Sequence, residues 1–582
     1  MEEKKFHLGL CLAGAVSAGA YSAGVMDYLF ETLEKWEKRK EENSPDTPSH
    51  HIVIDVIGGA SAGGMTGIIA AAALSNEIKP VKFPTNADEV LAEQPQNKFY
   101  HSWVDMSGKD TFAMMLETKD VDEDKKVTSL LNSCFIDKIA KKILEVDMNN
   151  LKPLPAYINT QLKVFTTLTN LEGFPFQISF KGNTSPDKYY MAIHNDYACF
   201  QFNKDENKKD GWMLLDFKSG KNVDTAIDAA LATGAFPIAL KSRKLTRKTD
   251  EVNSMKWLMD VDPVEGTDYT SLNIDGGTID NKPFAKVREV LIDITQQDDP
   301  EIYNDPNLFN STIIFIDPFP SEEMRKIKID DSIFRTFGYS LNTLVGQSRT
   351  NRGIISDAIN THLAGQFMIA PSRRRPTLSG EEERVAGGKA IACGGFVGFS
   401  GFINKEFRVH DYFLGRFNCE MMLRNRFIIP ESALEQNEIF REGYKGVDKS
   451  KFCIVREEKQ IVIEKEKLIM DGVETEREVN VEKIVKKKYY PIIPLFETRT
   501  DQFPMPVFSS GTNWPVIEAE KVEHYRPLIK KRSQAILFGI IKGSQFHKAL
   551  VWIGAKLVLN KTMSDAALNS IKKALKNHQL LK

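Results

Sequence analysis

Residues 52–67, IVIDVIGGASAGGMTG, restrict the fold more than any other part of the chain. The segment opens with an almost continuous β-branched, apolar run, as expected of a strand covered on both faces, and small helix-forming residues follow through 62–74. Between the two, Ser61 stands in a G-x-S-x-G pattern with Gly59 and Gly63. Such a pattern lets a strand turn sharply into a helix and exposes the serine hydroxyl above the helix N-terminus. An acyl-transfer nucleophile is presented in this way, and a tight turn that serves only packing is the alternative interpretation.

A carboxylate that could serve such a nucleophile lies in residues 271–284, SLNIDGGTIDNKPF. A short strand is expected to end at Ile274, and Asp275 is followed by Gly276 and Gly277, which leave space around its side chain. A carboxylate at a strand end is a suitable general base for a serine. A turn in which Asp275 only accepts backbone hydrogen bonds is the alternative.

The N-terminal segment predicts a third part of the same site. A strand at 8–13 leads into the small-residue turn at 14–19, and a helix is expected over about 20–40. Backbone N–H groups of such a turn can point at a developing oxyanion. A phosphate-binding loop is the competing interpretation, but the turn has neither G-x-G-x-x-G nor a Lys-Ser/Thr pair, so nucleotide binding is not expected.

In their order along the chain, 8–19, 52–67 and 271–284, these three segments resemble the patatin-like phospholipases. These are serine acyl hydrolases that use a Ser-Asp dyad, and the resemblance covers roughly the first 320 residues. The resemblance implies an α/β fold, a three-layer sandwich around a central, mostly parallel sheet. It also implies that Ser61 is the nucleophile and Asp275 the base, and that the substrate is a phospholipid or another acyl ester. Residues 162–173 and 226–240 are similar to the family as well. The matching motif glycines are Gly59, Gly63, Gly276 and Gly277.

The predicted oxyanion loop departs from the family pattern, which usually reads G-G-G-x-Arg/Lys-G. This chain has Ala15 and Val16 in place of two glycines, and Ala18 in place of the basic residue. Because the donors are main-chain N–H groups, we still expect the loop to hold an oxyanion. The candidate donors are Gly14, Ala15, Val16 and Ala62. The alternative function is a catalytically weak or inactive lipid-binding protein with the same fold.

A Ser-His-Asp triad is the main mechanistic alternative, with His362 or His410 as its histidine. Neither histidine follows a recognisable strand, and His410 lies in FRVHDYFLGRF, a segment that predicts a helix, so we prefer the dyad. No cofactor and no metal site are expected. The six cysteines form no C-x-x-C pair and predict neither zinc nor a disulfide framework, which favours a reducing, cytoplasmic compartment.

At 582 residues the chain is long enough for two or more domains. The predicted divisions are a catalytic α/β domain at 1–320 with a cap insertion at 79–146, a helical extension at 321–450, a charged β-hairpin at 451–490, and a basic helical region at 491–582. Within them we expect helices at 129–144 and 335–367, a sheet strand at 313–317, a loop at 371–383, and a two-residue hairpin turn at 471–472. The candidates to line an acyl pocket are Trp103, Phe112, Met114 and Met115, with a local core as the alternative.

Charge and hydropathy suggest how the chain meets its partners. Residues 530–582 hold ten lysines and one arginine against a single acid, in a chain of net charge −2. With their aromatic residues they suit peripheral contact with an anionic membrane, and packed C-terminal helices are the alternative. Nucleic-acid binding is not expected, because no recognition motif accompanies the charge. No apolar stretch reaches the roughly 18 residues of a membrane span, and the glutamates and glycines within 1–20 argue against a signal peptide.

Overall fold

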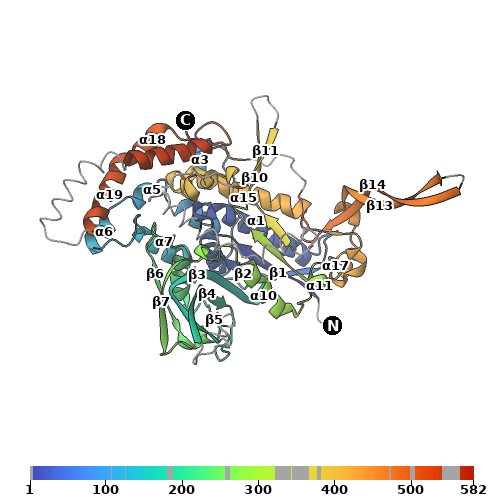
Figure 1. The fold of residues 1–582 in the computed structure, drawn as a ribbon, viewed down its shortest axis with the longest axis horizontal. Helices are drawn as coiled ribbons and strands as arrows, with labels where there is room; N and C mark the ends of the chain where they lie inside the picture. Colours follow the sequence, from blue (N-terminus) through green and yellow to red (C-terminus); the bar gives the residue numbers. More distant parts are fainter. Residues whose placement is uncertain are drawn as a thin grey trace.

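A computed structural model describes residues 4–106, 108–124, 126–179, 188–255, 263–320, 343, 366–376, 382–470, 473–497, 505–540 and 564–582. Within them, nine strands form one sheet in the order β5-β4-β3-β2-β1-β8-β9, and β6 and β7 join it through β3 (Figure 1). Parallel pairs make up its centre, so the predicted mixed fold with a central, mostly parallel sheet is confirmed. The strands are β1 (Lys5–Leu12), β2 (His51–Gly59), β3 (Ile158–Ser179), β4 (Lys188–Gln201), β5 (Met213–Leu214), β6 (Arg243–Lys248), β7 (Asp268–Asp275), β8 (Ser311–Ile316) and β9 (Gln366–Ile369).

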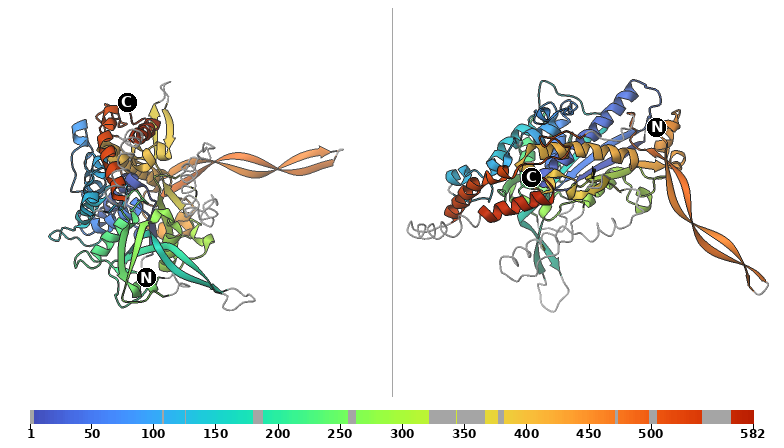
Figure 2. Two further views of the ribbon diagram at one scale, coloured as in Figure 1. Left: turned by 60° about the vertical axis from the view of Figure 1, so that its left-hand side comes forward. Right: turned by 90° about the horizontal axis from the view of Figure 1, so that it is seen from above.

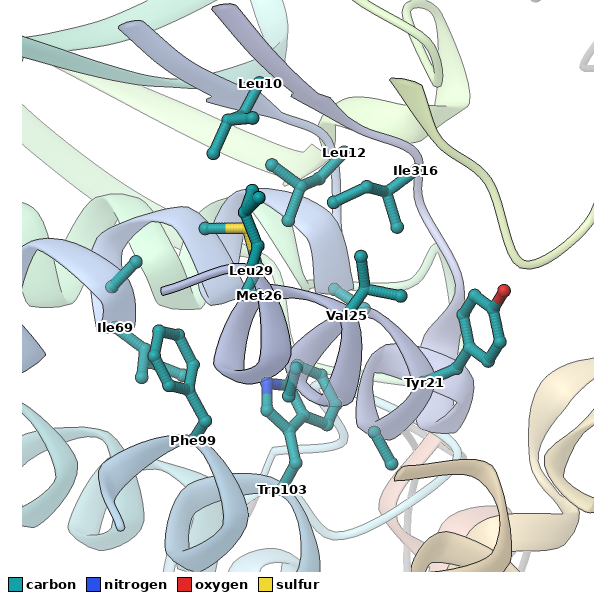
Figure 3. Packing of buried hydrophobic residues seen from close by; sticks show 14 of the residues in the cluster. Leu10, Leu12, Tyr21, Val25, Met26, Leu29, Ile69, Phe99, Trp103 and Ile316 are labelled. Carbon is teal, nitrogen blue, oxygen red and sulfur yellow. The ribbon is translucent and has the colours of Figure 1, made fainter. Parts of the chain in front are cut away.

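Helices cover both faces of this sheet and make the three predicted layers. Helices α1 (Gly19–Glu41) and α2 (Ala62–Ala73) lie on one face, where Leu10 and Leu12 of β1 pack on α1 (Figure 3). Helix α10 (Phe284–Thr295) lies on the other face, where Cys11 packs among its side chains. Successive side chains of a strand point to opposite faces, and β1 is apolar on both, so it is a buried central strand.

The insertion between β2 and β3 is built from short helices. They are α3 (Ala87–Val90), α4 (Lys98–Tyr100), the π-helical turn η2 (His101–Asp105), α5 (Thr111–Met115), α6 (Lys119–Asp124) and α7 (Cys134–Leu144). The helix predicted from residue 129 begins only at Cys134, because the N–H groups of Leu130 and Leu131 donate to the carbonyls of Ile238 and Ala239, each at 2.9 Å. The chain there is bound to the segment after α8 (Val223–Thr233) and is not helical.

The sheet continues beyond residue 320. The helix predicted over 335–367 lies mostly outside the described residues, and its end is wrong, because Gln366 and Phe367 belong to β9, which pairs with β8 in parallel. The loop predicted at 371–383 is also wrong: β10 (Ser372–Pro376) and β11 (Glu382–Ala386) form an antiparallel pair. Charged side chains dominate this pair, with Arg375 opposite Glu383, so it lacks the apolar alternation by which strands are predicted.

A long β-hairpin extends away from the body of the molecule (Figure 2). Strands β13 (Ile454–Met470) and β14 (Val473–Pro491) are antiparallel, and β14 also pairs with β12 (Ile428–Pro430). The register pairs Met470 with Val473, as the predicted two-residue connection requires, although 471–472 lie outside the described residues. The C-terminal region that contains it is largely helical, with α14 (Ser400–Ile403), α15 (Lys405–Asn425), α16 (Ala433–Gln436), α17 (Glu438–Gly443), α18 (Ala519–Glu523), α19 (Tyr525–Ile540) and a last helix at 564–577.

Helix α15 and helix α1 are in backbone contact. A Cβ placed on Gly24 of α1 would overlap the carbonyl oxygen of Tyr412 of α15, and a Cβ placed on Gly415 would overlap the carbonyl oxygen of Tyr21. Each helix therefore presents a glycine to the other, which brings the two main chains together. The C-terminal region shares its core with the N-terminal sheet domain through this contact, and the predicted division at residue 320 stays a prediction.

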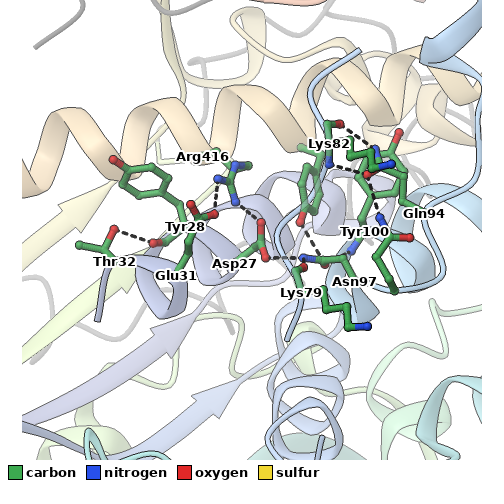
Figure 4. Close-up of polar contacts among 12 residues, drawn as sticks. Asp27, Tyr28, Glu31, Thr32, Lys79, Lys82, Gln94, Asn97, Tyr100 and Arg416 are labelled. Carbon is green, nitrogen blue, oxygen red and sulfur yellow. Dashed lines mark hydrogen bonds and ion pairs between the residues drawn. The ribbon is translucent and has the colours of Figure 1, made fainter. Parts of the chain in front are cut away.

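A cluster of polar side chains lies between these two helices and the insertion (Figure 4). Arg416 of α15 pairs with Asp27 and, at 2.6 Å, with Glu31 of α1. The side-chain amide of Asn97, the N-cap residue of α4 in the insertion, donates to Asp27 at 2.6 Å. Burial raises the pKa of Asp27, so its carboxylate depends on these partners. The cluster joins α1, α15 and the insertion.

Replacement of Gly24 by alanine should destabilise the protein. Alanine is the better helix former by about 1 kcal/mol, so propensity alone predicts a gain. The overlap with Tyr412 should reverse the sign, at a cost of about 1–3 kcal/mol, because the two helices must move apart. The midpoint of thermal unfolding should fall for Gly24→Ala and stay unchanged for Lys38→Ala, a change at an exposed position of the same helix. An unchanged or higher midpoint for Gly24→Ala would contradict the backbone contact.

A buried histidine of the N-terminal part contacts the C-terminal region at another point of this core. The Nε2 of His50 lies 2.8 Å from the carbonyl oxygen of Ile492, and its ring packs against Trp36 and Tyr444. Burial lowers the pKa of His50 to about 3. The folded protein thus holds this imidazole neutral at pH values where the unfolded chain protonates it.

His50 should therefore make folding stability depend on pH. As the pH falls below about 6.5, the unfolded chain binds a proton that the folded protein excludes, which costs about 1.4 kcal/mol per pH unit. The free energy of unfolding of the wild type, relative to that of His50→Gln, should decrease from pH 6.5 towards pH 4 and be constant above pH 7. Denaturant titrations of both proteins across this range measure this difference, from which the contributions of all other titratable groups cancel. A difference that does not vary with pH would show that His50 is not excluded from protonation.

Candidate functional site

The turn between β2 and α2 holds Ser61 in a strained conformation. Ser61 has φ 50° and ψ −126°, a region that residues with a side chain rarely occupy and that costs about 1–3 kcal/mol. Its N–H donates to the hydroxyl of Thr233 at 2.9 Å, and the N–H of Gly63 donates to the carbonyl of Ala60 at 2.8 Å. The predicted strand, turn and helix are confirmed, with Ser61 at the sharpest point of the turn.

The glycines on either side of Ser61 are needed because main-chain segments meet there. A Cβ on Gly59 would lie 2.5 Å from the carbonyl carbon of Gly63. A Cβ on Gly63 would overlap the carbonyl oxygen of Leu12, at the end of β1. The turn is therefore pressed against the neighbouring strand, and only glycine fits at these two positions.

Ser61 and Asp275 are in direct contact although they are 214 residues apart. The Ser61 hydroxyl donates to Oδ2 of Asp275 at 2.7 Å, and the N–H of Gly277 donates to Oδ1 at 2.7 Å. Both side chains are buried, with 6% and 3% of their surface exposed. The Asp275 main chain is fixed as well, because its N–H donates to the carbonyl of Ala235 at 2.9 Å and its carbonyl accepts from Thr169 at 3.0 Å. The carboxylate thus faces the serine hydroxyl from a rigid strand end.

Gly276 completes this strand end. A Cβ on Gly276 would overlap the carbonyl oxygen of Thr167 in β3, so the turn after Asp275 lies directly on the neighbouring strand. The short helix η4 (Gly276–Thr278) begins there, and the Asp275 side chain caps it. The two glycines after Asp275 are therefore structural requirements of the turn that aims the carboxylate.

The loop after β1 passes beside Ser61. A Cβ on Gly14 would lie 3.0 Å from the Cβ of Ser61, and the N–H of Gly14 donates to the carbonyl of Asn281 at 3.2 Å. Within the described parts of the chain, the N–H groups of Ala15, Val16 and Ala62 have no acceptor. These three groups stay candidates for the oxyanion donors, whereas the N–H of Gly14 already has a partner.

Two site residues were missed by reasoning from the sequence. Thr233, at the end of α8, receives the Ser61 N–H bond, and Asn281 places its side-chain oxygen between Gly14 and Gly277. Asn281 stands in the loop after Asp275, but nothing in that pattern gave it a role. Thr233 had no signal beyond its place in a segment similar to the family.

The four candidates for an acyl pocket lie in different surroundings. The ring of Trp103 fills the space where a Cβ of Gly19 would stand, at the start of α1. Phe112 makes edge-to-face contact with Tyr525 of α19, with ring centroids 5.0 Å apart, which favours a core role for it. Met115 is buried and Met114 is 37% exposed. That these side chains line an acyl pocket stays a prediction.

Of the two histidine alternatives, the described residues include His410, whose partners are Asp411, Phe508 and Trp514 and not Ser61. His410 is buried in α15, where its Nδ1 lies 2.7 Å from Asp411 and its ring packs edge-on against Trp514. Burial lowers the pKa of His410, so it is a neutral packed residue. His362 lies outside the described residues. Among the residues that the structure describes, no cluster of His, Cys, Asp and Glu could hold a metal ion.

Comparison with known proteins gives a family match over the N-terminal half of the chain. A family model described as patatin-like phospholipase matches residues 10–287, a range that includes Ser61 and Asp275. The chain is also similar to a protein of Sinorhizobium fredii named Uncharacterized protein y4iI, with 31% identity over 476 residues. That match covers 73% of this chain and 65% of the relative, so the chain spans about two thirds of the relative's length.

Proposed function

Residues 10–287 place this chain in the patatin-like phospholipase family, and from that premise we propose that it is a lipid acyl hydrolase of the phospholipase A or lysophospholipase type. The observation that carries the proposal is the 2.7 Å hydrogen bond from Ser61 to Asp275 on a strained turn. A serine becomes a nucleophile when a base within hydrogen-bond distance accepts its proton. The substrate is a glycerophospholipid or lysophospholipid, and no cofactor takes part.

The reaction follows from the geometry in two halves. Asp275 takes the proton of Ser61 while Oγ attacks the acyl carbonyl carbon, and the carbonyl electron pair moves onto its oxygen. When the tetrahedral intermediate collapses, the ester C–O bond breaks and the alcohol leaves with the proton from Asp275. Water then attacks the acyl-enzyme with Asp275 as base, and the fatty acid is released as Ser61 regains its proton.

The oxyanion of each half is held by main-chain groups. The N–H of Ala62 stands at the N-terminus of α2, where the helix dipole also favours negative charge. The N–H groups of Ala15 and Val16 approach from the loop after β1. The N–H of Gly14 already donates to the carbonyl of Asn281 and so helps to fix the loop. We therefore assign the donor role to the N–H groups of Ala15, Val16 and Ala62.

A non-catalytic lipid-binding protein is the alternative function. The changes at Ala15, Val16 and Ala18 favour it, because the loop lacks two of the family's glycines and its basic residue. The hydrogen bond between Ser61 and Asp275 favours the enzyme, because a binding protein has no need of a buried serine that faces a carboxylate.

Peripheral contact of 530–582 with an anionic membrane stays part of the proposal. Lys530 and Lys531 of α19 are exposed, whereas Leu568 and Leu575 of the last helix are buried. Residues 541–563 of this region, which include four of its ten lysines, lie outside the described residues. Among the helices in the described ranges, none is both long enough and apolar enough to cross a membrane.

A fluorophosphonate probe should label the wild type at Ser61, and Ser61→Ala should lose both the label and ester turnover. The unfolding midpoint should be retained, because alanine is as small as serine and fits the same turn. Ser129→Ala, which removes a buried hydroxyl that donates to the carbonyl of Leu131, should keep labelling and turnover and serves as the matched control. Absence of labelling in the folded wild type would favour the lipid-binding alternative.

Asp275→Asn should lower ester turnover by about 10²- to 10⁴-fold, the usual loss of a general base. An amide in its place keeps the shape but cannot accept the Ser61 proton. His410→Gln and His362→Ala should lose little turnover if they fold, because the proton passes to Asp275. Steady-state rates on a short soluble ester measure the three variants. A loss at either histidine that equals the loss at Asp275, in a folded protein, would favour a triad.

A further inference from the structure

Besides Ser61 in the turn before α2, the site has a second strained residue, and this one lies in the oxyanion loop. Val16 has φ 48°, a conformation that glycine adopts freely and that a β-branched residue strongly disfavours. Nothing in the local sequence favours this backbone, since Val16 stands between small residues and begins the short helix η1 (Val16–Ala18). Contacts from elsewhere must therefore hold the loop.

Those contacts come from residues 395–401 of the C-terminal region. The Ser17 hydroxyl donates to the carbonyl of Gly398 and accepts the N–H of Gly401 at 3.1 Å. Gly398 lies so close to the loop that a Cβ on it would be 3.1 Å from the Cβ of Val16. Ser17 is fully buried between the two segments. Both hydrogen bonds join residues more than 380 positions apart in the chain.

The 395–401 segment is itself held by α15. The backbone N–H groups of Ala392 and Cys393, shortly before it in the chain, donate to the carboxylate of Asp411 at 2.7 and 2.9 Å. At its other end the Arg408 guanidinium donates to the carbonyl of Gly401 and, at 3.1 Å, to the carbonyl of Val104 in the insertion. The segment is therefore fixed at both ends to buried charged groups of one helix.

We propose that residues 395–401 form a brace that imposes the left-handed backbone of Val16 and so positions the oxyanion donors, with Ser17 as the positioning residue. The inference rests on the proposed function for its catalytic consequence, but the brace itself is a structural claim. It makes activity depend on a segment that lies outside residues 10–287, the range of the family match. An oxyanion donor acts on the transition state more than on the bound ester, so the brace should act on kcat.

Ser17→Ala should lower kcat at least tenfold and change KM by less than about twofold, because the donors are displaced from the oxyanion and not from the substrate's other contacts. Gly398→Ala should lower kcat in the same way, because Gly398 has φ 88° and lies against Val16, so an alanine there strains the brace and presses on the loop. This second variant tests the inference even if Ser17→Ala does not fold. Ser129→Ala is the control for the loss of a buried hydroxyl.

Rescue separates a brace from a general structural role. If the brace serves to impose a positive φ on Val16, a glycine at that position should make it dispensable, because glycine adopts this backbone unaided. In the Val16→Gly background, Ser17→Ala should therefore cost less than about threefold in kcat, against at least tenfold in the parent, a coupling that a double-mutant cycle measures. Equal losses in the two backgrounds would overturn the proposal.

Hydrogen exchange makes the test independent of catalysis. Ser17→Ala should raise the exchange of amides in peptides that cover 14–18, and Ser129→Ala should not. If the wild type neither binds the fluorophosphonate nor turns over an ester, the proposed function fails while this measurement still decides the brace. Unchanged exchange in Ser17→Ala would overturn the brace even in an active enzyme.

Discussion

Main-chain segments around Ser61 approach one another so closely that a Cβ is excluded at several positions, and the rest of the site depends on this constraint. Gly63 stands against the end of β1, and Gly276 stands against β3. These approaches fix the angle at which the chain enters α2 and the angle at which it leaves β7. The 2.7 Å bond between Ser61 and Asp275 follows, because neither residue has a backbone free to move. The glycines of the two motifs therefore position the site because, without a Cβ, they allow the main-chain segments to lie this close together.

The C-terminal region belongs to the same packed structure. Its helix α15 meets α1 through the glycines at 24 and 415, and Arg416 brings its charge to Asp27 of α1. Because α1 begins where the oxyanion loop ends, any shift of this helix pair would be transmitted to the loop. A buried ion pair contributes little net stability, but removal of one partner costs about 3–5 kcal/mol, so such a cluster fixes the relative position of the helices.

Local patterns predicted the central parts of the fold and of the candidate site. The strand, turn and helix around Ser61 could be predicted, because an apolar run followed by glycines and small residues has few alternative structures. That Asp275 would lie beside Ser61 came from the family resemblance and not from spacing, since no local rule connects residues 214 positions apart. Strands β10 and β11 were missed because charged pairs stabilise them, and periodicity detects only apolar faces. The contact of Ser17 with residues 398 and 401 could not be predicted, because a buried serine in a small-residue turn has no pattern that names a distant partner.

The two strained residues of the site differ in what holds them. The positive φ of Ser61 is held by its own neighbours in the N-terminal half: β2, α2 and the hydroxyl of Thr233. The positive φ of Val16 lies where the family pattern has glycine, and a glycine would need no support. A valine there can persist only if the surrounding structure determines its backbone, and that structure is the C-terminal region. The valine in the loop thus depends on the brace at 395–401. In this arrangement the N-terminal part supplies the proposed nucleophile and base, and the C-terminal region fixes the loop that faces them.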